Sequence, residues 1–154
     1  KSKREYLGER IYNINEIGYK YHMNDIAALI GLENLKITKA KIKHLRLIAK
    51  AYDRELKNIK GITILKRSKN VISSYWLYTI LVDDRSKFFH LLKKHKIQTS
   101  LVHRRIDRYK IFGGINNDLT GQRTFNKKHI CLTIHEKVKI EDVKKIKKIL
   151  LNNY

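Results

Sequence analysis

Apolar residues recur at every third or fourth position over long stretches of the N-terminal part of the chain, with charged residues between them. Between Asn24 and Lys60 these apolar positions are Ile26, Leu29, Ile30, Leu45, Ile48, Ala49, Tyr52, Leu56 and Ile59. The spacing predicts one long helix, or two helices in line, with Asn24 or Asp25 as the N-cap. The Lys60–Gly61 pair is typical of a helix C-terminus.

The rest of the chain alternates short apolar runs with helical patterns. Strands are expected at 62–65, 74–82, 97–103 and 130–134. Helices are expected at 85–96, near 121–129 and from about Glu141, with an irregular stretch at 104–120. Most connections are too short for a purely parallel sheet. The order therefore predicts a two-layer α/β sandwich with a long N-terminal helix and a mixed or antiparallel sheet.

Length and composition favour a single globular domain over residues 1–154. The chain is 42% hydrophobic, and no repeat or linker divides it. Its one cysteine, Cys131, lies in an apolar run, which predicts a buried, inert thiol and a reducing cytoplasm. No run is long enough to span a membrane. Because the first residue is Lys1 and not methionine, we expect a processed piece of something longer.

The formal net charge of +21 is typical of nucleic-acid-binding proteins. However, the basic residues are spread along the whole chain, and only "VKKIKKIL" is dense in lysine. Abundant lysine and isoleucine with no proline is also the pattern that an A+T-rich coding sequence leaves. Nucleic acid is therefore an alternative partner and not the favoured one, because a localised basic stripe would be the stronger signal.

Five segments in order resemble the C-terminal part of the sugar aminotransferases of the DegT/DnrJ/StrS type. They are "GYKYHMNDIAALIGLENLK", "AYDREL", "SYWLYTILVDD", "LLKKHKIQTSLVH" and "LTIHEKVKIEDVKKIKKIL", and the resemblance runs from about Glu9 to Leu151. Members of this family are pyridoxal-phosphate (PLP) enzymes of the aspartate-aminotransferase fold (fold type I). They place an amino group on a nucleotide-linked keto-sugar, for amino-sugar biosynthesis in polysaccharides or glycans.

The resemblance implies that residues 24–154 form the small domain and that residues 1–23 are a connecting or interface segment. It also implies that the catalytic large domain is absent, because the Schiff-base lysine and the acidic partner of the PLP ring would lie upstream of Lys1. The chain alone should then hold no catalytic residue and not transaminate. The resemblance implies that the complete enzyme binds PLP, a nucleotide-sugar and an amino-acid donor, and that this chain alone does not bind PLP stably. The complete enzyme would be cytoplasmic. It would form a homodimer, or this chain would associate with a separate large domain.

The first candidate site is the segment "GYKYHMND", directly before the long helix. The resemblance implies that it lies at a dimer interface, with Lys20 and His22 reaching the cofactor phosphate of the neighbouring subunit. A helix N-terminus with two basic side chains suits a phosphate. Many relatives have Asn in place of Lys20 and Arg in place of His22, so the chain departs from the family in detail. The alternative is a capped helix start with exposed polar residues.

The second candidate site is "TSLVHRRIDRYKIF". The resemblance implies that His103 lies at a strand end near the sugar, and Arg104 and Arg105 could bind the nucleotide pyrophosphate. The alternative is a solvated basic surface. A metal site is not expected, because His129 and His135 have no third ligand at a useful spacing.

Three functions therefore compete for this sequence. The chain is the small domain of a nucleotide-sugar aminotransferase, a basic nucleic-acid-binding module, or a non-catalytic remnant that associates with a full-length partner.

Overall fold

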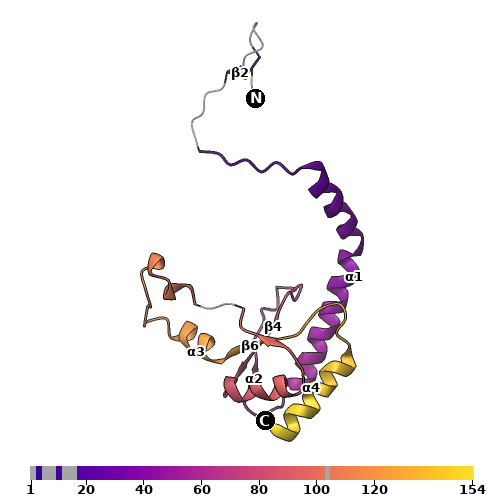
Figure 1. Ribbon diagram of the computed structural model, residues 1–154, viewed down its shortest axis with the longest axis vertical. Helices are drawn as coiled ribbons and strands as arrows, with labels where there is room; N and C mark the ends of the chain where they lie inside the picture. The colour runs from indigo at the N-terminus through magenta and orange to yellow at the C-terminus, as the bar shows by residue number, and fades with distance from the viewer. Residues whose placement is uncertain (1–2, 5–9, 12–16, 103–104) are drawn as a thin grey trace. The chain divides into compact units, whose positions relative to one another are not determined.

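The computed structural model describes residues 3–4, 10–11, 17–102 and 105–154 (Figure 1). These residues fall in two compact units, Lys1–Lys36 and Ile37–Tyr154. In the first unit, β1 (Lys3–Arg4) pairs antiparallel with β2 (Arg10–Ile11). The expectation of one domain over residues 1–154 stays a prediction.

The long helix α1 (Asp25–Leu56) begins in the first unit and continues into the second. It confirms the prediction of one continuous helix. Asn24 is the N-cap, since its side-chain oxygen Oδ1 accepts a hydrogen bond of 2.8 Å from the Ala27 amide. The helix ends at Leu56, earlier than the predicted end at Lys60–Gly61, and Gly61 instead turns the chain towards β3 with the positive φ of 78° that glycine adopts without strain.

The second unit contains a four-stranded sheet in the order β3–β4–β6–β5. Its strands are β3 (Ile62–Ile64), β4 (Tyr78–Val82), β5 (Thr99–Ser100) and β6 (His129–Leu132). Every neighbouring pair is antiparallel, and Ile80 lies opposite both Ile64 and Ile130. The predicted α/β class is confirmed, and the sheet is antiparallel and not mixed.

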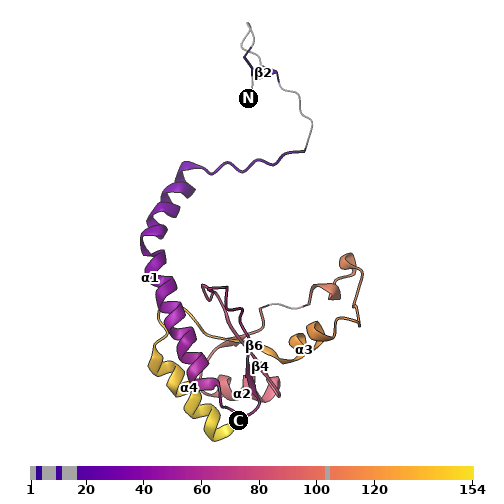
Figure 2. The same cartoon turned by 180° about the vertical axis from the view of Figure 1, so that it is seen from behind.

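Helices cover one face of this sheet and bury the core. The second half of α1, α2 (Arg85–Lys94) and α4 (Ile140–Asn153) lie on this side in both views (Figures 1 and 2). The largest fully buried side chains are Tyr52, Tyr78, Phe88, Ile48, Leu56, Ile80, Leu92, Ile130 and Leu150. Burying such a side chain stabilises the fold by roughly 1.5–3 kcal/mol relative to leaving it exposed.

Hydrogen bonds among Asp53, Arg67 and Tyr78 hold the β3–β4 connection against α1. The Tyr52 and Tyr78 rings stack with centroids 4.7 Å apart, and the Tyr78 hydroxyl donates to Asp53 Oδ1 at 2.6 Å. Arg67 donates twice to the same carboxylate, at 2.6 and 3.0 Å. Burial raises the pKa of Tyr78, and the Asp53 carboxylate raises it further. The phenol therefore stays protonated and keeps donating to Asp53.

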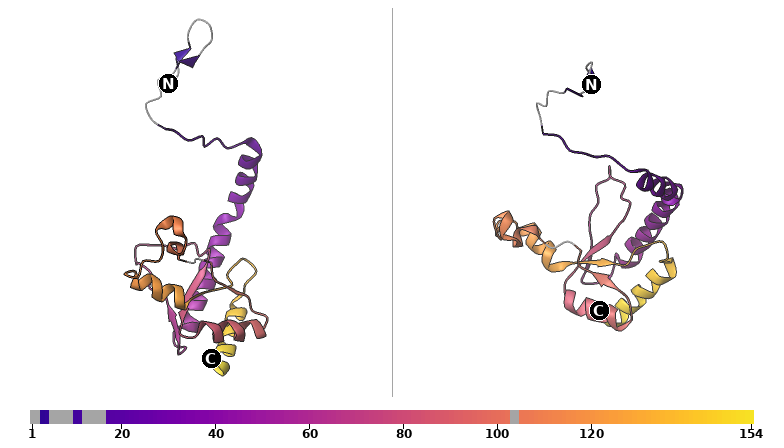
Figure 3. Two further views of the ribbon diagram at one scale, coloured as in Figure 1. Left: turned by 60° about the vertical axis from the view of Figure 1, so that its left-hand side comes forward. Right: turned by 45° about the horizontal axis from the view of Figure 1, so that its top comes forward.

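On the side of the sheet away from α4, α3 (Thr120–Lys128) contacts β4, and a segment of two 3₁₀ turns, η1 (Ile106–Arg108) and η2 (Lys110–Phe112), precedes α3 in the chain. His129 is buried here, with its ring stacked on Phe125 at 4.4 Å and its Nδ1 bonded to the Phe125 carbonyl at 2.8 Å. The segment between η1 and α3 projects away from α4 in all the views of Figure 3 and Figure 1.

Two predicted strands are shorter than the sequence indicated. The run 74–82 becomes a strand only from Tyr78, because Tyr75 has a φ of 54° that turns the chain before it. The run 97–103 pairs with β6 only at Thr99 and Ser100. Trp76, before β4, lies outside the core with 71% of its surface exposed.

The C-terminus of α2 is a Schellman motif with an unusual residue. The Ile97 amide bonds to the Leu92 carbonyl at 2.9 Å, and the Lys96 amide bonds to the Lys93 carbonyl at 2.9 Å. Lys96 therefore occupies the left-handed position that is usually glycine, with a φ of 59°. A lysine at this position carries a conformational cost that a glycine would not.

Candidate functional site

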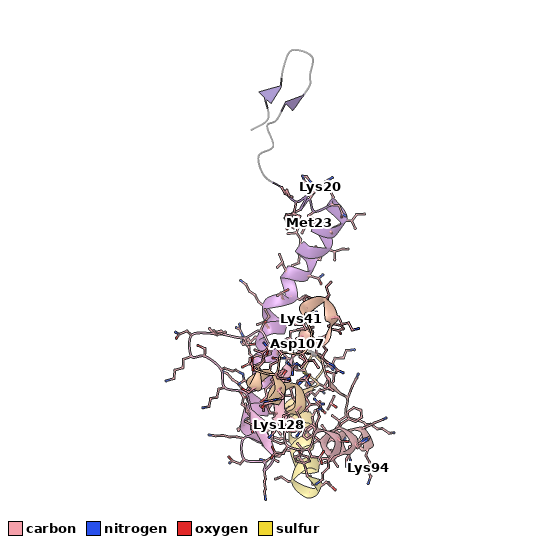
Figure 4. All side chains as sticks on the ribbon, turned by 90° about the vertical axis from the view of Figure 1, so that its left-hand side faces the viewer. Lys20, Met23, Lys41, Lys94, Asp107 and Lys128 are labelled. Carbon is pink, nitrogen blue, oxygen red and sulfur yellow. The ribbon has the colours of Figure 1, made fainter. Side chains whose placement is uncertain are left out.

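The segment before α1 presents its side chains to solvent. Residues 17–24 have no regular secondary structure, and Lys20 and His22 are both exposed. Figure 4 labels Lys20 and Met23 beside the start of α1. Both basic side chains are thus available to an anionic group. The predicted role of Lys20 and His22 in binding cofactor stays a prediction.

The start of α1 offers free donors to such a group. The Asn24 side chain and carbonyl bond to the amides of Ala27 and Ala28. Within the described part of the chain, the amides of Asp25 and Ile26 have no hydrogen-bond partner. Free amides at a helix N-terminus carry a partial positive charge and suit a phosphate. The exposed Asp25 carboxylate opposes this charge in part.

The same unit exposes an extended apolar surface. It runs along the segment before α1 and around more than one side of the first turns of α1, since Ile26 and Leu35 lie on opposite sides of the helix. The exposed apolar residues are Ile17, Tyr19, Tyr21, Met23, Ile26, Leu29, Ile30, Leu32 and Leu35. Monomeric proteins rarely expose a contiguous apolar surface of this kind, so this one is typical of a surface that another protein surface covers.

The second candidate site begins with two residues, His103 and Arg104, that lie outside the described residues. Arg105 is described and buried, with 7% of its surface exposed. Its guanidinium donates to both carboxylate oxygens of Asp107, with Nε 2.6 Å from Oδ1, and Nη2 also donates to the Asn116 carbonyl at 2.9 Å. Its donors thus point into the segment that it belongs to. The predicted role of Arg105 in binding substrate stays a prediction.

Asp107 binds both ends of the segment 105–116, and we call the contacts among Arg105, Asp107 and Asn116 the clasp. The Asp107 Oδ2 accepts the Asn116 amide at 3.0 Å, and Figure 4 labels Asp107 among the side chains of the second unit. The Arg105 guanidinium first, and the Asn116 amide to a smaller extent, lower the pKa of Asp107 to about 2. Sequence reasoning missed Asp107, although its position two residues after an arginine was a possible signal.

The clasp leaves the apolar side chains of its own segment exposed. Ile106, Tyr109, Ile111, Phe112, Ile115 and Leu119 are each at least 46% exposed. Gly113 and Gly114 have φ values of 88° and 87° and turn the chain between them. A segment closed by a buried ion pair but covered with exposed apolar groups is typical of a surface that binds another molecule.

We expect Asp107→Asn to open this segment. The substitution leaves the buried Arg105 guanidinium without its counter-ion, so the Asn116 amide should lose protection from hydrogen exchange at neutral pH. In the unchanged chain the lowered pKa stabilises the clasp above about pH 4, and this stabilisation is lost as the pH falls towards 2. Protection factors from NMR exchange, measured against pH, check both results.

Asp118→Asn is the matched control, because it removes the same charge from the same segment and Asp118 forms no ion pair among the described residues. Equal protection of Asn116 in both variants would contradict the role given to Asp107.

The described residues offer no alternative catalytic centre of a familiar kind. They contain no group of three His, Cys, Asp or Glu side chains that could hold a metal ion. Cys131 is buried, as predicted, and its Sγ lies 3.3 Å from the Thr79 hydroxyl. None of the described helices is both long enough and apolar enough to span a membrane.

Comparison with known proteins gives one consistent group of relatives. The sequence profile of the DegT/DnrJ/EryC1/StrS aminotransferase family matches residues 1–151. The chain is 33% identical over 160 aligned positions to the uncharacterized protein MJ1066 of Methanocaldococcus jannaschii, covering 95% of this chain and 42% of that protein. It is 31% identical over 144 positions to dTDP-4-amino-4,6-dideoxy-D-glucose transaminase of Escherichia coli, covering 87% of this chain and 39% of that protein.

Solved structures agree with these relatives. The sugar aminotransferase CalS13 from Micromonospora echinospora superposes with a TM-score of 0.84 at 25% identity, over 96% of this chain and 40% of its own. AtS13 from Actinomadura melliaura superposes with a TM-score of 0.83 at 26% identity, over 99% of this chain and 41% of its own. The chain thus spans about two fifths of the length of the proteins that it matches.

Proposed function

Because the chain belongs to the DegT/DnrJ/EryC1/StrS aminotransferase family, we propose that it forms the C-terminal small domain of a PLP-dependent enzyme. The complete enzyme would transfer an amino group from an amino acid to a nucleotide-linked keto-sugar, for a polysaccharide or glycan. The relative from Escherichia coli is named as a transaminase of a nucleotide-linked amino-sugar. The family match over nearly the whole chain is the observation that carries this proposal.

The exposed apolar surfaces support an incomplete enzyme. The surface formed by residues 17–35 and the segment 106–119 are each exposed in their own unit. The part that the chain matches is only 42% of the archaeal relative and 39% of the Escherichia coli transaminase. We propose that the large domain and a second subunit cover these surfaces, so that the complete enzyme is a dimer.

Lys20 and His22 would hold the phosphate of PLP. Both side chains are exposed beside a helix N-terminus with free amides, which fits the charge and the donor geometry of a phosphate. When bound, PLP supplies the electron sink that transamination needs. The role of Lys20 and His22 would be to keep the cofactor in place and fix its orientation.

The nucleotide-sugar would bind at the second candidate site. His103 and Arg104 are proposed to contact it directly, and Arg105 to contribute a donor if the clasp opens or to hold their segment if it stays closed. The Arg105 contacts to Asp107 and Asn116 favour the holding role. We place the complete enzyme in the cytoplasm, where a reduced thiol such as Cys131 persists.

A hybrid enzyme tests this function. In the hybrid, the present chain replaces the part of the Escherichia coli transaminase that it matches. The proposal predicts that the hybrid folds, binds PLP and transaminates a nucleotide-linked keto-sugar. The remnant alternative predicts a folded hybrid that binds PLP poorly, because the chain's own site residues no longer serve the cofactor.

A further inference from the structure

A hollow with basic walls lies in the second unit, between the end of α2, the segment after β6 and the start of α4. Its volume is about 470 Å³. Five basic side chains line it: His95, Lys96, His135, Lys137 and Lys145. We propose that this basic hollow binds a small phosphate-type anion such as pyrophosphate. The proposal does not depend on the proposed function, because none of these residues belongs to the candidate sites above.

Hydrogen bonds between three segments fix the walls of the basic hollow. The Tyr52 hydroxyl on α1 donates to the Thr133 carbonyl at 2.9 Å. The Thr133 hydroxyl in turn donates to the Gln98 carbonyl at 2.6 Å, beyond the end of α2. Tyr52 is fully buried, so this chain of bonds is anchored in the core. The backbone around the basic hollow is thus fixed before any ligand arrives, which lowers the cost of binding, while the five basic side chains themselves are exposed.

The positive charge of the basic hollow is only partly compensated, because the Glu136 carboxylate interacts with the charge of Lys137 but forms no ion pair with it among the described residues. Across residues 17–102 and 105–154, Lys96, Lys137 and Lys145 form no ion pair with a carboxylate. The single carboxylate that lines the basic hollow belongs to Asp142, and its Oδ2 accepts the Lys139 amide at 2.9 Å. Like charges held together without counter-ions repel one another, and an anion between them relieves this repulsion.

The pKa of a neighbouring acid agrees with this charge distribution. The pKa of Glu136 lies below its ordinary value, first because its carboxylate accepts a hydrogen bond from its own amide and next because of Lys41. The charge of Lys137, which lines the basic hollow, lowers it further.

The backbone conformation of Lys96 also supports a functional role for this residue. Lys96 holds the left-handed position at the end of α2, where glycine would be free of strain. Strained residues tend to persist at functional positions, where the side chain compensates for the conformational cost. The Schellman bonds also satisfy carbonyls at the end of α2, which weakens the negative helix end that would otherwise repel an anion.

The chemistry of the walls fits a phosphate-type ligand. Lysine ammonium groups bind phosphate oxygens as point charges with short hydrogen bonds. His135 accepts the Lys137 amide at its Nδ1 with a distance of 3.1 Å, so its neutral ring carries the proton on Nε2 and donates there. A volume of about 470 Å³ lies in the range of small-molecule sites and admits a pyrophosphate with its bound water.

Titration of residues 1–154 with pyrophosphate at constant ionic strength tests the proposal. Amide shifts in NMR spectra should move at Lys96, Thr133 and Lys137, and Lys96→Gln/Lys137→Gln/Lys145→Gln should weaken binding by about tenfold or more. The matched control Lys57→Gln/Lys60→Gln/Lys69→Gln removes the same charge from exposed lysines outside the basic hollow. It should change the affinity by about twofold or less.

Two results would overturn the proposal. Equal weakening in the two triple variants would mean that only the overall charge of the protein attracts pyrophosphate. Sulfate binding as tightly as pyrophosphate at the same ionic strength would mean that the basic hollow has no site for a phosphate-type ligand.

A single variant separates binding from folding. Lys96→Gly removes the strained conformation, so its melting temperature should rise, while the loss of one ammonium group should weaken pyrophosphate binding about threefold. A loss of affinity in this variant cannot come from unfolding. Unchanged pyrophosphate affinity in Lys96→Gly would remove Lys96 from the site and contradict the explanation given for its conformation.

Discussion

Phe88→Ala should lower the free energy of unfolding by about 3–5 kcal/mol, as expected for truncating a buried aromatic side chain. Phe88 is fully buried on the inner side of α2, where its ring meets Tyr154 edge-on at 5.4 Å. Removing the ring leaves a cavity between α2 and the C-terminus, which the backbone cannot close without moving both. Urea denaturation followed by circular dichroism measures the difference.

Phe89→Ala is the matched control for this loss. Phe89 has the same side chain on the same helix but is 38% exposed, and Lys93 lies 5.9 Å from its ring centroid. Its truncation should cost about 1 kcal/mol, the central value for measured point substitutions. If the two variants lost equal stability, the packing of α2 against the sheet described above would be wrong.

In the hybrid enzyme, Lys20→Ala should weaken PLP retention by about 1–3 kcal/mol, the value expected for a charge-assisted contact to phosphate. The stability of the hybrid should change much less, because the Lys20 side chain is exposed in its unit. The PLP dissociation constant, measured from the bound fraction after gel filtration, gives the affinity. Lys36→Ala removes the same charge from the same unit and should leave PLP retention unchanged.

His22→Arg should act in the opposite direction. Arginine supplies a permanent charge and a forked donor, while a neutral histidine supplies one donor. PLP should therefore dissociate more slowly from this variant. Unchanged PLP affinity in both Lys20→Ala and His22→Arg would remove the segment before α1 from the cofactor site.

The two neighbouring phenylalanines show how far the sequence could predict the fold. Helical spacing puts Phe88 and Phe89 together on the apolar side of the helix predicted at 85–96, and this helix is confirmed as α2, with Asp84 as its N-cap. The spacing of apolar residues alone does not determine which of the two rings is buried. This depends on how α2 is rotated about its axis against strands that are distant in the sequence. The helix predicted from about Glu141 is confirmed as α4, which buries Val143 and Ile146 at helical spacing.

Contacts between distant residues account for what the sequence could not show. The strand ending at Val82 begins late because Tyr75 turns the chain, a conformation that no local propensity predicts. The lysines of the basic hollow come from separate segments of the chain, so no motif search would group them. Arg105 was predicted from its charge as a ligand for the substrate, but the fold brings Asn116 and Asp107 to its guanidinium.

The PLP content of the hybrid enzyme tests the central claim most directly. The claim is that this chain serves as the small domain of a PLP-dependent sugar aminotransferase. The account predicts about one PLP per subunit after gel filtration, in a dimer that transaminates a nucleotide-linked keto-sugar. A hybrid that unfolds cooperatively and has the same oligomeric state as the parent enzyme, yet retains no PLP, would contradict it.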